Sequence, residues 1–183
     1  MTDTKENAQN GLILVQCRQG KREGLEALVR TWHQPLFYYV KRLVGKEEDA
    51  WDVIQDAWLR VFRGIISVRS AAALPKWLYK VARSAAMTHL RKARHWNALH
   101  EESPDETVID TAASHLTGDF SAQQIHLALE KLPLPEREVL TLHFLEGYQV
   151  AEIAEITDAP IGTVKSRMNR AKKNLRHVLE EER

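Results

Sequence analysis

Cysteine is almost absent from this 183-residue sequence, which contains only one. A single cysteine excludes an intrachain disulfide framework and a zinc site built from paired cysteines. Long apolar runs are also absent, since uncharged stretches such as residues 11–15 are far shorter than the roughly 20 residues that span a membrane. The N-terminus has neither the basic nor the apolar segment of a secretory signal. These absences predict a soluble, cytoplasmic protein with no membrane insertion of its own.

Motifs that would indicate an enzyme are missing as well. There is no HExxH sequence, no glycine-rich phosphate loop and no pair of carboxylates in a supporting context. His89, His95 and His100 are spaced by six and five residues, which does not place them on one face of a helix. Cys17 lies among apolar residues and is most simply a small buried group. We therefore expect no catalytic residue, no metal site and no cofactor.

Net charge is lacking too, but the charges are strongly segregated along the chain. Residues 1–96 carry 17 Lys and Arg against 9 Asp and Glu, whereas residues 97–119 carry 6 acidic residues and no Lys or Arg. A second basic run, residues 160–177, has 6 basic residues and no acid. Two basic segments separated by an acidic one inform us about the partners of the protein rather than its fold.

Apolar residues recur at spacings of three and four through most of the chain outside residues 97–119, which predicts helices. Gly45 is suited to end one helix, and the acids that follow it favour the start of the next. Residues 65–74 lack this periodicity and predict a loop or a weak turn, after which Pro75 fits the first position of a helix running to about Arg94. No strand-like alternation of useful length occurs, so the sequence predicts an all-α fold.

The helix expected after Gly45 has a broad apolar stripe that we expect to be core. The stripe consists of Ala50, Val53, Ile54, Ala57, Trp58, Val61 and Phe62. Trp51 and Trp58 fall beside or within it. We therefore expect both tryptophans to pack in the protein rather than to stack on nucleic-acid bases.

Residues 149–179 have the pattern of a helix-turn-helix motif. A short apolar helix precedes a turn at residues 157–160, and the following helix has apolar residues at spacings of three and four: Ile161, Val164, Met168, Ala171, Leu175 and Val178. This stripe is expected to be core, which leaves polar and basic residues on the other faces. Such a helix suits the major groove of DNA, where hydroxyl and amide groups read base edges and Lys or Arg contact phosphate or guanine. A solvated basic surface helix is the simpler alternative.

Two blocks of sequence resemble the extracytoplasmic-function sigma factors of bacterial RNA polymerase. Residues 152–176, which read EIAEITDAPIGTVKSRMNRAKKNLR, are similar to region 4 of that family. Residues 47–62, which read EEDAWDVIQDAWLRVF, and the WLYKVAR sequence at residues 77–83 are similar to region 2. A helix-turn-helix pattern alone would be weak evidence for this family, because other regulators share it. Two blocks in the order of the family are far more specific.

The resemblance implies both an architecture and a function. It implies a region 2-like domain at residues 11–96, an acidic flexible linker at 97–119 and a region 4-like helix-turn-helix domain of four helices at 120–183. The chain would then bind core RNA polymerase and direct it to promoter DNA. The four residues implied to contact core polymerase lie close to one face of a helix: Asp49, Asp52, Gln55 and Asp56. An ordinary amphipathic surface helix is the alternative for this segment.

The same resemblance assigns two DNA-binding elements. The helix after Pro75 would bind the −10 promoter element through Lys76, Lys80, Arg83, Ser84, Arg91 and Lys92, with Arg94 as a further phosphate contact. The preceding loop, residues 64–74, would hold an extruded base. Ser84 stands where many family members have Asn, and this loop is rich in Ala and poor in aromatic residues.

The helix after residue 160 would bind the −35 element through Thr163, Lys165, Ser166, Arg167, Asn169, Arg170 and Lys173. We expect Lys165, Ser166, Asn169 and Arg170 to face the groove, provided that Val164 and Met168 point into the core. Arg167, Lys172 and Lys173 would serve mainly phosphates.

Two further partners and one alternative function follow. The linker, with its net charge of −6, would lie in a basic polymerase channel as a nucleic-acid mimic, although a solvated tether fits its composition equally well. An anti-sigma factor is expected by resemblance only. The alternative function is a stand-alone helix-turn-helix regulator that binds DNA without binding core polymerase.

Overall fold

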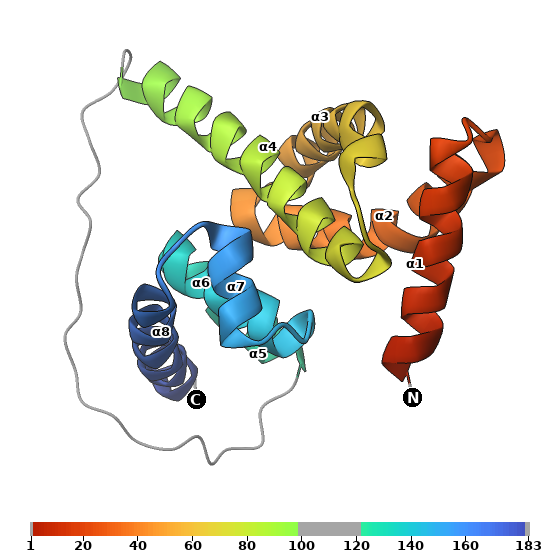
Figure 1. The fold of residues 1–183 in the computed structure, drawn as a ribbon. Coiled ribbons are helices and arrows are strands. Elements are labelled where there is room, and N and C mark those ends of the chain that lie inside the picture. Colours follow the sequence, from red (N-terminus) through yellow and green to blue (C-terminus); the bar gives the residue numbers. More distant parts are fainter. Residues whose placement is uncertain (1, 99–121, 182–183) are drawn as a thin grey trace. The chain divides into compact units, whose positions relative to one another are not determined.

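The computed structural model describes residues 2–98 and 122–181, and every regular element within these ranges is helical (Figure 1). The all-α prediction is therefore confirmed. The helices form two compact units. Helices α1 to α3 and most of α4 form the first unit, and α5 to α8 make up most of the second. None of the described helices is long and apolar enough to cross a membrane.

The first unit begins with three helices that pack in sequence order, α1 against α2 and α2 against α3. They are α1 (Thr2–Arg18), α2 (Arg22–Val44) and α3 (Glu47–Gly64). Two short 3₁₀ turns and a long helix follow: η1 (Ile65–Ser67), η2 (Ala71–Ala73) and α4 (Leu74–Ala98). The predicted loop at residues 65–74 thus consists largely of these turns. Helix α1 extends well before residue 11, where the sequence indicated no helix.

Two glycines shape the ends of helices in this unit. Gly45 ends α2 with a φ of 85°, a left-handed conformation that glycine adopts without strain, and its N–H donates to the carbonyl of Lys41 at 2.8 Å. At the end of α3, a Cβ atom on Gly64 would lie only 3.0 Å from the ring of Trp77. Glycine therefore allows the chain to leave α3 close to α4.

The core of the first unit contains the aliphatic and aromatic residues that the periodicity indicates, including Leu28, Leu36 and Ile54. Tyr39 of α2 and Tyr79 of α4 are both buried, and their rings meet edge to face at a centroid distance of 5.1 Å. Cys17 is buried in α1, as expected, and burial raises the pKa of its thiol. This core holds the surfaces of α3 and α4 in place.

The predicted stripe of α3 is correct except at its edge. Trp58 is buried, but Phe62 is 40% exposed and stacks on the Trp58 ring from outside at 5.6 Å. Trp51 packs on the ring of Phe37, with the centroids 4.4 Å apart, in agreement with its predicted packing role, although its side chain remains 45% exposed. The apolar arc of α3 is wider than the surface its neighbours cover, so the edge residues pack on other aromatic rings.

The second unit contains four helices and one π-helical turn. These elements are α5 (Ala122–Lys131), α6 (Leu134–Leu140), η3 (Thr141–Leu145), α7 (Val150–Thr157) and α8 (Ile161–Glu181). Both α5 and α6 pack against α8. The π turn widens the helix that continues from α6, so that Leu142 is buried and Phe144 is 59% exposed.

The predicted helix-turn-helix is formed by α7 and α8. The N–H of Gln149 donates to the Glu152 carboxylate at 2.9 Å, which stabilises the start of α7. Asp158 ends α7 in the left-handed conformation with a φ of 54°, which Asp tolerates better than most residues. Ala159 then donates to the carbonyl of Ala154 at 3.1 Å. The turn therefore has a defined geometry before α8 begins.

The apolar stripe of α8 is buried at Val164, Met168, Ala171 and Leu175, as predicted. Its first and last positions differ from the prediction. Ile161 is 49% exposed because it is the first residue of α8, and Leu179 rather than Val178 completes the buried stripe. The linker prediction lies almost entirely outside the described residues, although α4 extends to Ala98 and so includes its first two positions.

Candidate nucleic-acid and protein interfaces

Helix α8 presents its predicted DNA-binding residues on the side opposite its buried stripe. Lys165, Ser166, Asn169 and Arg170 are exposed, and Thr163, Arg167 and Lys173 are half-buried. Val164 is fully buried and Met168 is 5% exposed, so the condition set for a groove-facing surface is met. Among the described residues, the side chains of Lys165, Ser166 and Asn169 have no hydrogen-bond or ion-pair partner. They are available to an external partner.

Two basic residues of α8 contact side chains of other elements in the second unit. The Lys172 ammonium lies 5.5 Å from the centroid of the exposed Phe144 ring, within cation–π range. Arg170 is 62% exposed, and its Nε atom is 3.9 Å from Oε1 of the buried Glu136. The other oxygen of Glu136 accepts a hydrogen bond from Nδ2 of Asn174 at 2.7 Å. No sequence pattern indicated this contact between α6 and α8.

Helix α3 presents acidic and amide groups to solvent. Asp52, Gln55 and Asp56 are exposed, while Asp49 is half-buried with its carboxylate 3.4 Å from Nε2 of His89 in α4. Asp52 and Gln55 have no side-chain hydrogen bond or ion pair within the described part of the chain. Of the four residues predicted to bind core polymerase, Asp52 and Gln55 are therefore free for a partner, whereas Asp49 and Asp56 also contact side chains of their own unit.

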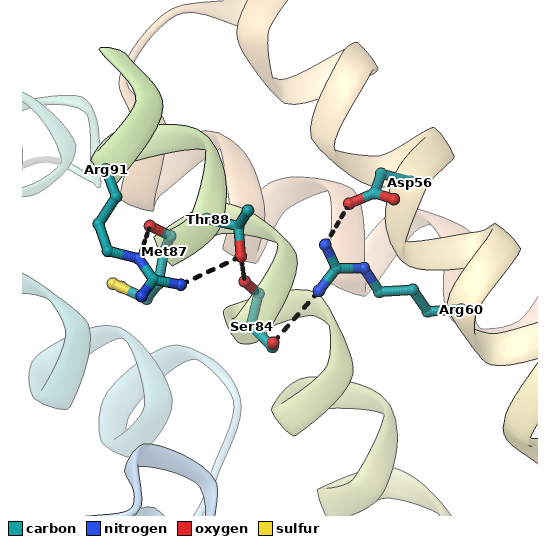
Figure 2. A network of polar contacts seen from close by, with 6 residues as sticks. All are labelled: Asp56, Arg60, Ser84, Met87, Thr88 and Arg91. Carbon is teal, nitrogen blue, oxygen red and sulfur yellow. Dashed lines mark hydrogen bonds and ion pairs between the residues drawn. The ribbon is translucent and has the colours of Figure 1, made fainter. Parts of the chain in front are cut away.

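A polar network joins α3 to α4 at the other edge of this acidic surface. Figure 2 shows Arg60 between Asp56 and Ser84. Its Nη2 atom is 2.7 Å from Oδ2 of Asp56, and its Nη1 atom donates to the hydroxyl oxygen of Ser84 at 3.2 Å. Arg60 thus connects a residue predicted to bind polymerase with one predicted to bind promoter DNA. Sequence reasoning missed Arg60, although its i,i+4 spacing from Asp56 is a recognisable ion-pair signal.

The network continues along α4. Thr88 donates to the carbonyl of Ser84 at 2.8 Å, and Arg91 donates to the Thr88 hydroxyl at 3.4 Å and to the carbonyl of Met87 at 3.3 Å (Figure 2). Ser84 and Arg91 are therefore connected through Thr88, and each has a partner within the unit. The other predicted −10 residues occupy α4 as follows: Lys80 and Lys92 are exposed, and Lys76 and Arg83 are half-buried.

No group of three or more potential metal ligands occurs within residues 2–98 and 122–181. His89 is paired with Asp49, and His100 lies outside the described residues. Arg137 is largely enclosed, and burial lowers the pKa of its guanidinium while nearby Glu130 opposes this shift. Its Nη1 atom donates to the carbonyl of Glu130 at 2.9 Å, which joins α5 to α6.

Comparisons with known proteins place the two surfaces in context. Residues 28–95 match the family described as sigma-70 region 2, and residues 122–175 match sigma-70 region 4. The chain is 30% identical to the ECF RNA polymerase sigma factor SigM of Mycobacterium tuberculosis, over 96% of this chain and 87% of that protein. It is 26% identical to the ECF RNA polymerase sigma-E factor of Haemophilus influenzae, over 96% and 97% of the two chains.

Solved structures agree with this similarity. The sigma factor RpoE of Bartonella quintana, in complex with the anti-sigma factor NepR, superposes with a TM-score of 0.70 at 25% identity, covering 86% of this chain and 98% of that one. CnrH, in complex with the cytosolic domain of CnrY, shares the fold with a TM-score of 0.69 at 18% identity, covering 96% and 99% of the two chains.

Proposed function

Because the chain belongs to the extracytoplasmic-function sigma factors of RNA polymerase, we infer that it binds core RNA polymerase and directs promoter recognition and transcription initiation. The observation that carries this conclusion is the presence of both family regions, at residues 28–95 and 122–175, in one chain. A stand-alone DNA-binding regulator would account for the second region only. The protein acts as an initiation factor and not as an enzyme, and its place of action is the cytoplasm, where the polymerase works.

We propose that α3 is the surface for core polymerase, with Asp49, Asp52, Gln55 and Asp56 as its contacts. The exposure of Asp52 and Gln55 supports this role. Within the described residues their side chains have no hydrogen bond or ion pair, so no internal contact has to be broken when a basic partner binds. Asp49 and Asp56 would exchange His89 and Arg60 for groups of the polymerase. The acidic surface would also accelerate encounter with a basic partner.

We propose that α4 binds the −10 element through Lys76, Lys80, Arg83, Ser84, Arg91 and Lys92. The basic residues would bind phosphates, and the hydroxyl of Ser84 would donate toward a base edge. The contact from Arg60 supports this polarity, because a hydroxyl oxygen that already accepts from Arg60 still has its proton to donate. The segment before α4, with its two 3₁₀ turns, is where an extruded base would be held.

We propose that α8 binds the −35 element in the major groove. Lys165, Ser166, Asn169 and Arg170 would read base edges, and Thr163, Arg167 and Lys173 would contact the backbone at the edges of the groove. The exposure of Lys165, Ser166, Asn169 and Arg170 opposite the buried stripe supports this orientation. Lys172, which lies over Phe144, would serve phosphates from a more fixed position.

We also propose regulation by an anti-sigma factor. The sigma factor RpoE of Bartonella quintana, which is 25% identical to this chain, was solved in complex with the anti-sigma factor NepR. For this chain, such a partner would have to cover the surface of α3, α4 or α8 to prevent polymerase or promoter binding.

The test is reconstitution of the full chain with core RNA polymerase, followed by in vitro transcription from a library of genomic fragments. The expected result is a complex at submicromolar concentration and selective transcription from a class of promoters. Absence of a complex at micromolar concentration would overturn the proposed function. Sequence-specific DNA binding by the chain alone, without such a complex, would support the stand-alone regulator instead.

A further inference from the structure

Glu136 is a carboxylate with an unusual position for a DNA-binding unit. It lies in the first turn of α6, a helix that packs against the proposed recognition helix α8. The side chain is only 9% exposed. A buried carboxylate is unfavourable unless polar or charged groups compensate for its lost hydration. The identity of those groups therefore indicates what the residue does.

Both oxygens of Glu136 are directed at α8. Oε2 accepts a hydrogen bond from Nδ2 of Asn174 at 2.7 Å, and Oε1 is 3.9 Å from Nε of Arg170. Arg170 and Asn174 are four residues apart, so they lie on the same face of α8. The hydrogen bond fixes the carboxylate, and the fixed carboxylate then attracts the guanidinium. At 3.9 Å the second contact is an ionic attraction rather than a hydrogen bond.

The state of Arg170 makes this contact functionally interesting. Its side chain is 62% exposed, and within the described residues it has no partner other than Glu136. Contact through Nε leaves the two terminal amino groups of the guanidinium unpaired. These groups can form the paired hydrogen bonds by which arginine recognises the O6 and N7 atoms of guanine. A flexible arginine loses side-chain entropy on binding, and a neighbouring carboxylate reduces that loss by restricting the free side chain.

We propose that Glu136 is the positioning residue for Arg170, and that it restricts the guanidinium to the geometry that reads one base pair of the −35 element. This inference rests on the proposed function of α8. Glu136 does not touch DNA itself. The negative charge of Glu136, close to the groove, disfavours binding to the phosphates of any DNA sequence. Glu136 therefore favours only the sequence that Arg170 recognises, and it raises selectivity more than affinity.

The experiment uses the full chain in holoenzyme with core polymerase, on promoter duplexes in which each −35 base pair is substituted in turn. Arg170→Ala is expected to reduce the ratio of matched to mismatched affinity about tenfold at one base pair. Glu136→Gln should reduce the ratio at the same base pair about threefold to fivefold, with affinity for mismatched duplexes unchanged or higher, because a negative charge is lost. The double variant should be no less selective than Arg170→Ala alone.

Two controls separate positioning from a structural role. Glu136→Gln keeps an oxygen that can accept a hydrogen bond from Asn174, so the unit should still fold, and urea unfolding checks this. Asn174→Ala removes that hydrogen bond but keeps the charges of Glu136 and Arg170. Because Asn174 fixes the carboxylate, the positioning role predicts that Asn174→Ala also lowers selectivity at the base pair of Arg170, whereas a purely structural role predicts that neither variant alters it. Glu180→Gln removes a carboxylate from Arg176, a residue of α8 with no assigned base, and should leave selectivity unchanged.

The outcomes distinguish the two levels of the proposal. If Arg170→Ala relaxes one position and Glu136→Gln does not, or if Glu136→Gln has the same effect in the Arg170→Ala background, the positioning role is wrong and the reading role of α8 stands. If Arg170→Ala relaxes no position, the assignment of Arg170 as a reader fails, and the role of Glu136 fails with it.

Discussion

The surface formed by α3 and α4 differs from that of α8 in how its polar residues are held. On α3 and α4, Asp49, Asp56, Ser84 and Arg91 each contact another side chain or a backbone carbonyl of the same unit. On α8, the side chains of Lys165, Ser166 and Asn169 have no such partner in the described part of the chain. One surface is a network across two helices, and the other is the outer face of a single helix.

This difference has a physical consequence for how each surface can function. Residues of a network affect one another, so substitutions on α3 and α4 are expected to be non-additive and to alter polymerase and promoter binding together. Residues on one exposed helical face are nearly independent, so substitutions on α8 should act position by position. Arg170 and Lys172 are the exceptions on α8, because Arg170 is connected to Glu136 of α6 and Lys172 lies over the ring of Phe144.

The largest effect is expected at Asp52, a residue of the surface formed by α3 and α4 that takes no part in the polar network, and it concerns the affinity for core polymerase. Asp52→Arg should weaken binding of core polymerase about 100-fold, because it places a positive charge against a basic partner. The fold should be unaffected, since the Asp52 side chain is exposed and has no hydrogen-bond or ion-pair partner within the described residues. The measurement is titration of fluorescently labelled protein with core polymerase.

Glu23→Arg is the matched control for Asp52→Arg, because Glu23 is an exposed acid on α2 outside the proposed surface and, like Asp52, has no hydrogen-bond or ion-pair partner within the described residues. It should leave the affinity for core polymerase within a factor of two or so, as expected for a surface charge away from the contact. Equal losses for both variants would mean that overall charge, rather than α3, determines binding.

The next effect compares two basic residues of α8. Arg170→Ala should relax selectivity at one −35 base pair by about tenfold, corresponding to about 1–3 kcal/mol for a base contact. Lys173→Ala should weaken binding to all sequences alike and reduce the slope of log affinity against log salt by about one unit. The measurement is holoenzyme binding to matched and mismatched duplexes across a salt series. If Lys173→Ala changed sequence preference and Arg170→Ala did not, the orientation assigned to α8 would be wrong.

A smaller effect tests the network itself. Arg60→Ala should lower the free energy of unfolding by about 1 kcal/mol, because it removes the ionic contact with Asp56 and the hydrogen bond with Ser84 that joins α3 to α4. It should also change how strongly substitutions in the −10 element affect promoter opening, while selectivity among −35 sequences stays the same. Urea unfolding followed by tryptophan fluorescence gives the first quantity, and promoter opening by holoenzyme gives the second.

Arg22→Ala provides the comparison, because Arg22 and Glu26 form an ion pair within one helix, with side chains 89% and 58% exposed. Loss of this pair should cost no more than about 0.5 kcal/mol. Equal destabilisation by Arg60→Ala and Arg22→Ala would indicate that the bridge from α3 to α4 adds nothing to an ordinary surface pair.

The smallest effect concerns Cys17, the sole cysteine and a buried residue of the first unit. Burial raises the pKa of its thiol, so the folded state retains the proton at a pH where the unfolded state loses it. The contribution of Cys17 to the free energy of unfolding is therefore constant below the unfolded pKa of about 8.5, and it decreases as the pH rises above that value. Alkylation followed by mass spectrometry should be slow in the folded protein. Labelling at the rate of the urea-unfolded chain would contradict this burial and would show that the first unit opens readily.

The sequence by itself determined the helices and their order. Spacings of three and four placed Val164, Met168 and Leu175 on one side of α8, and burial of that side left the basic residues exposed, because a helix has only one geometry for a given spacing. The glycine after α2 and the acids at the start of α3 indicated their boundary for similarly local reasons. The two family blocks were also recognisable from local sequence alone.

Only the tertiary structure decided which side chains meet across helices. Arg60 and Ser84 are 24 residues apart in sequence, and Glu136 and Asn174 are 38 apart, so no local pattern connects them. The exposure of Trp51 and Phe62 likewise depends on how much of α3 the neighbouring helices cover. Periodicity shows which face of a helix is apolar, but the width of the buried face is set by packing, and contacts between helices depend on the angle and depth at which they pack.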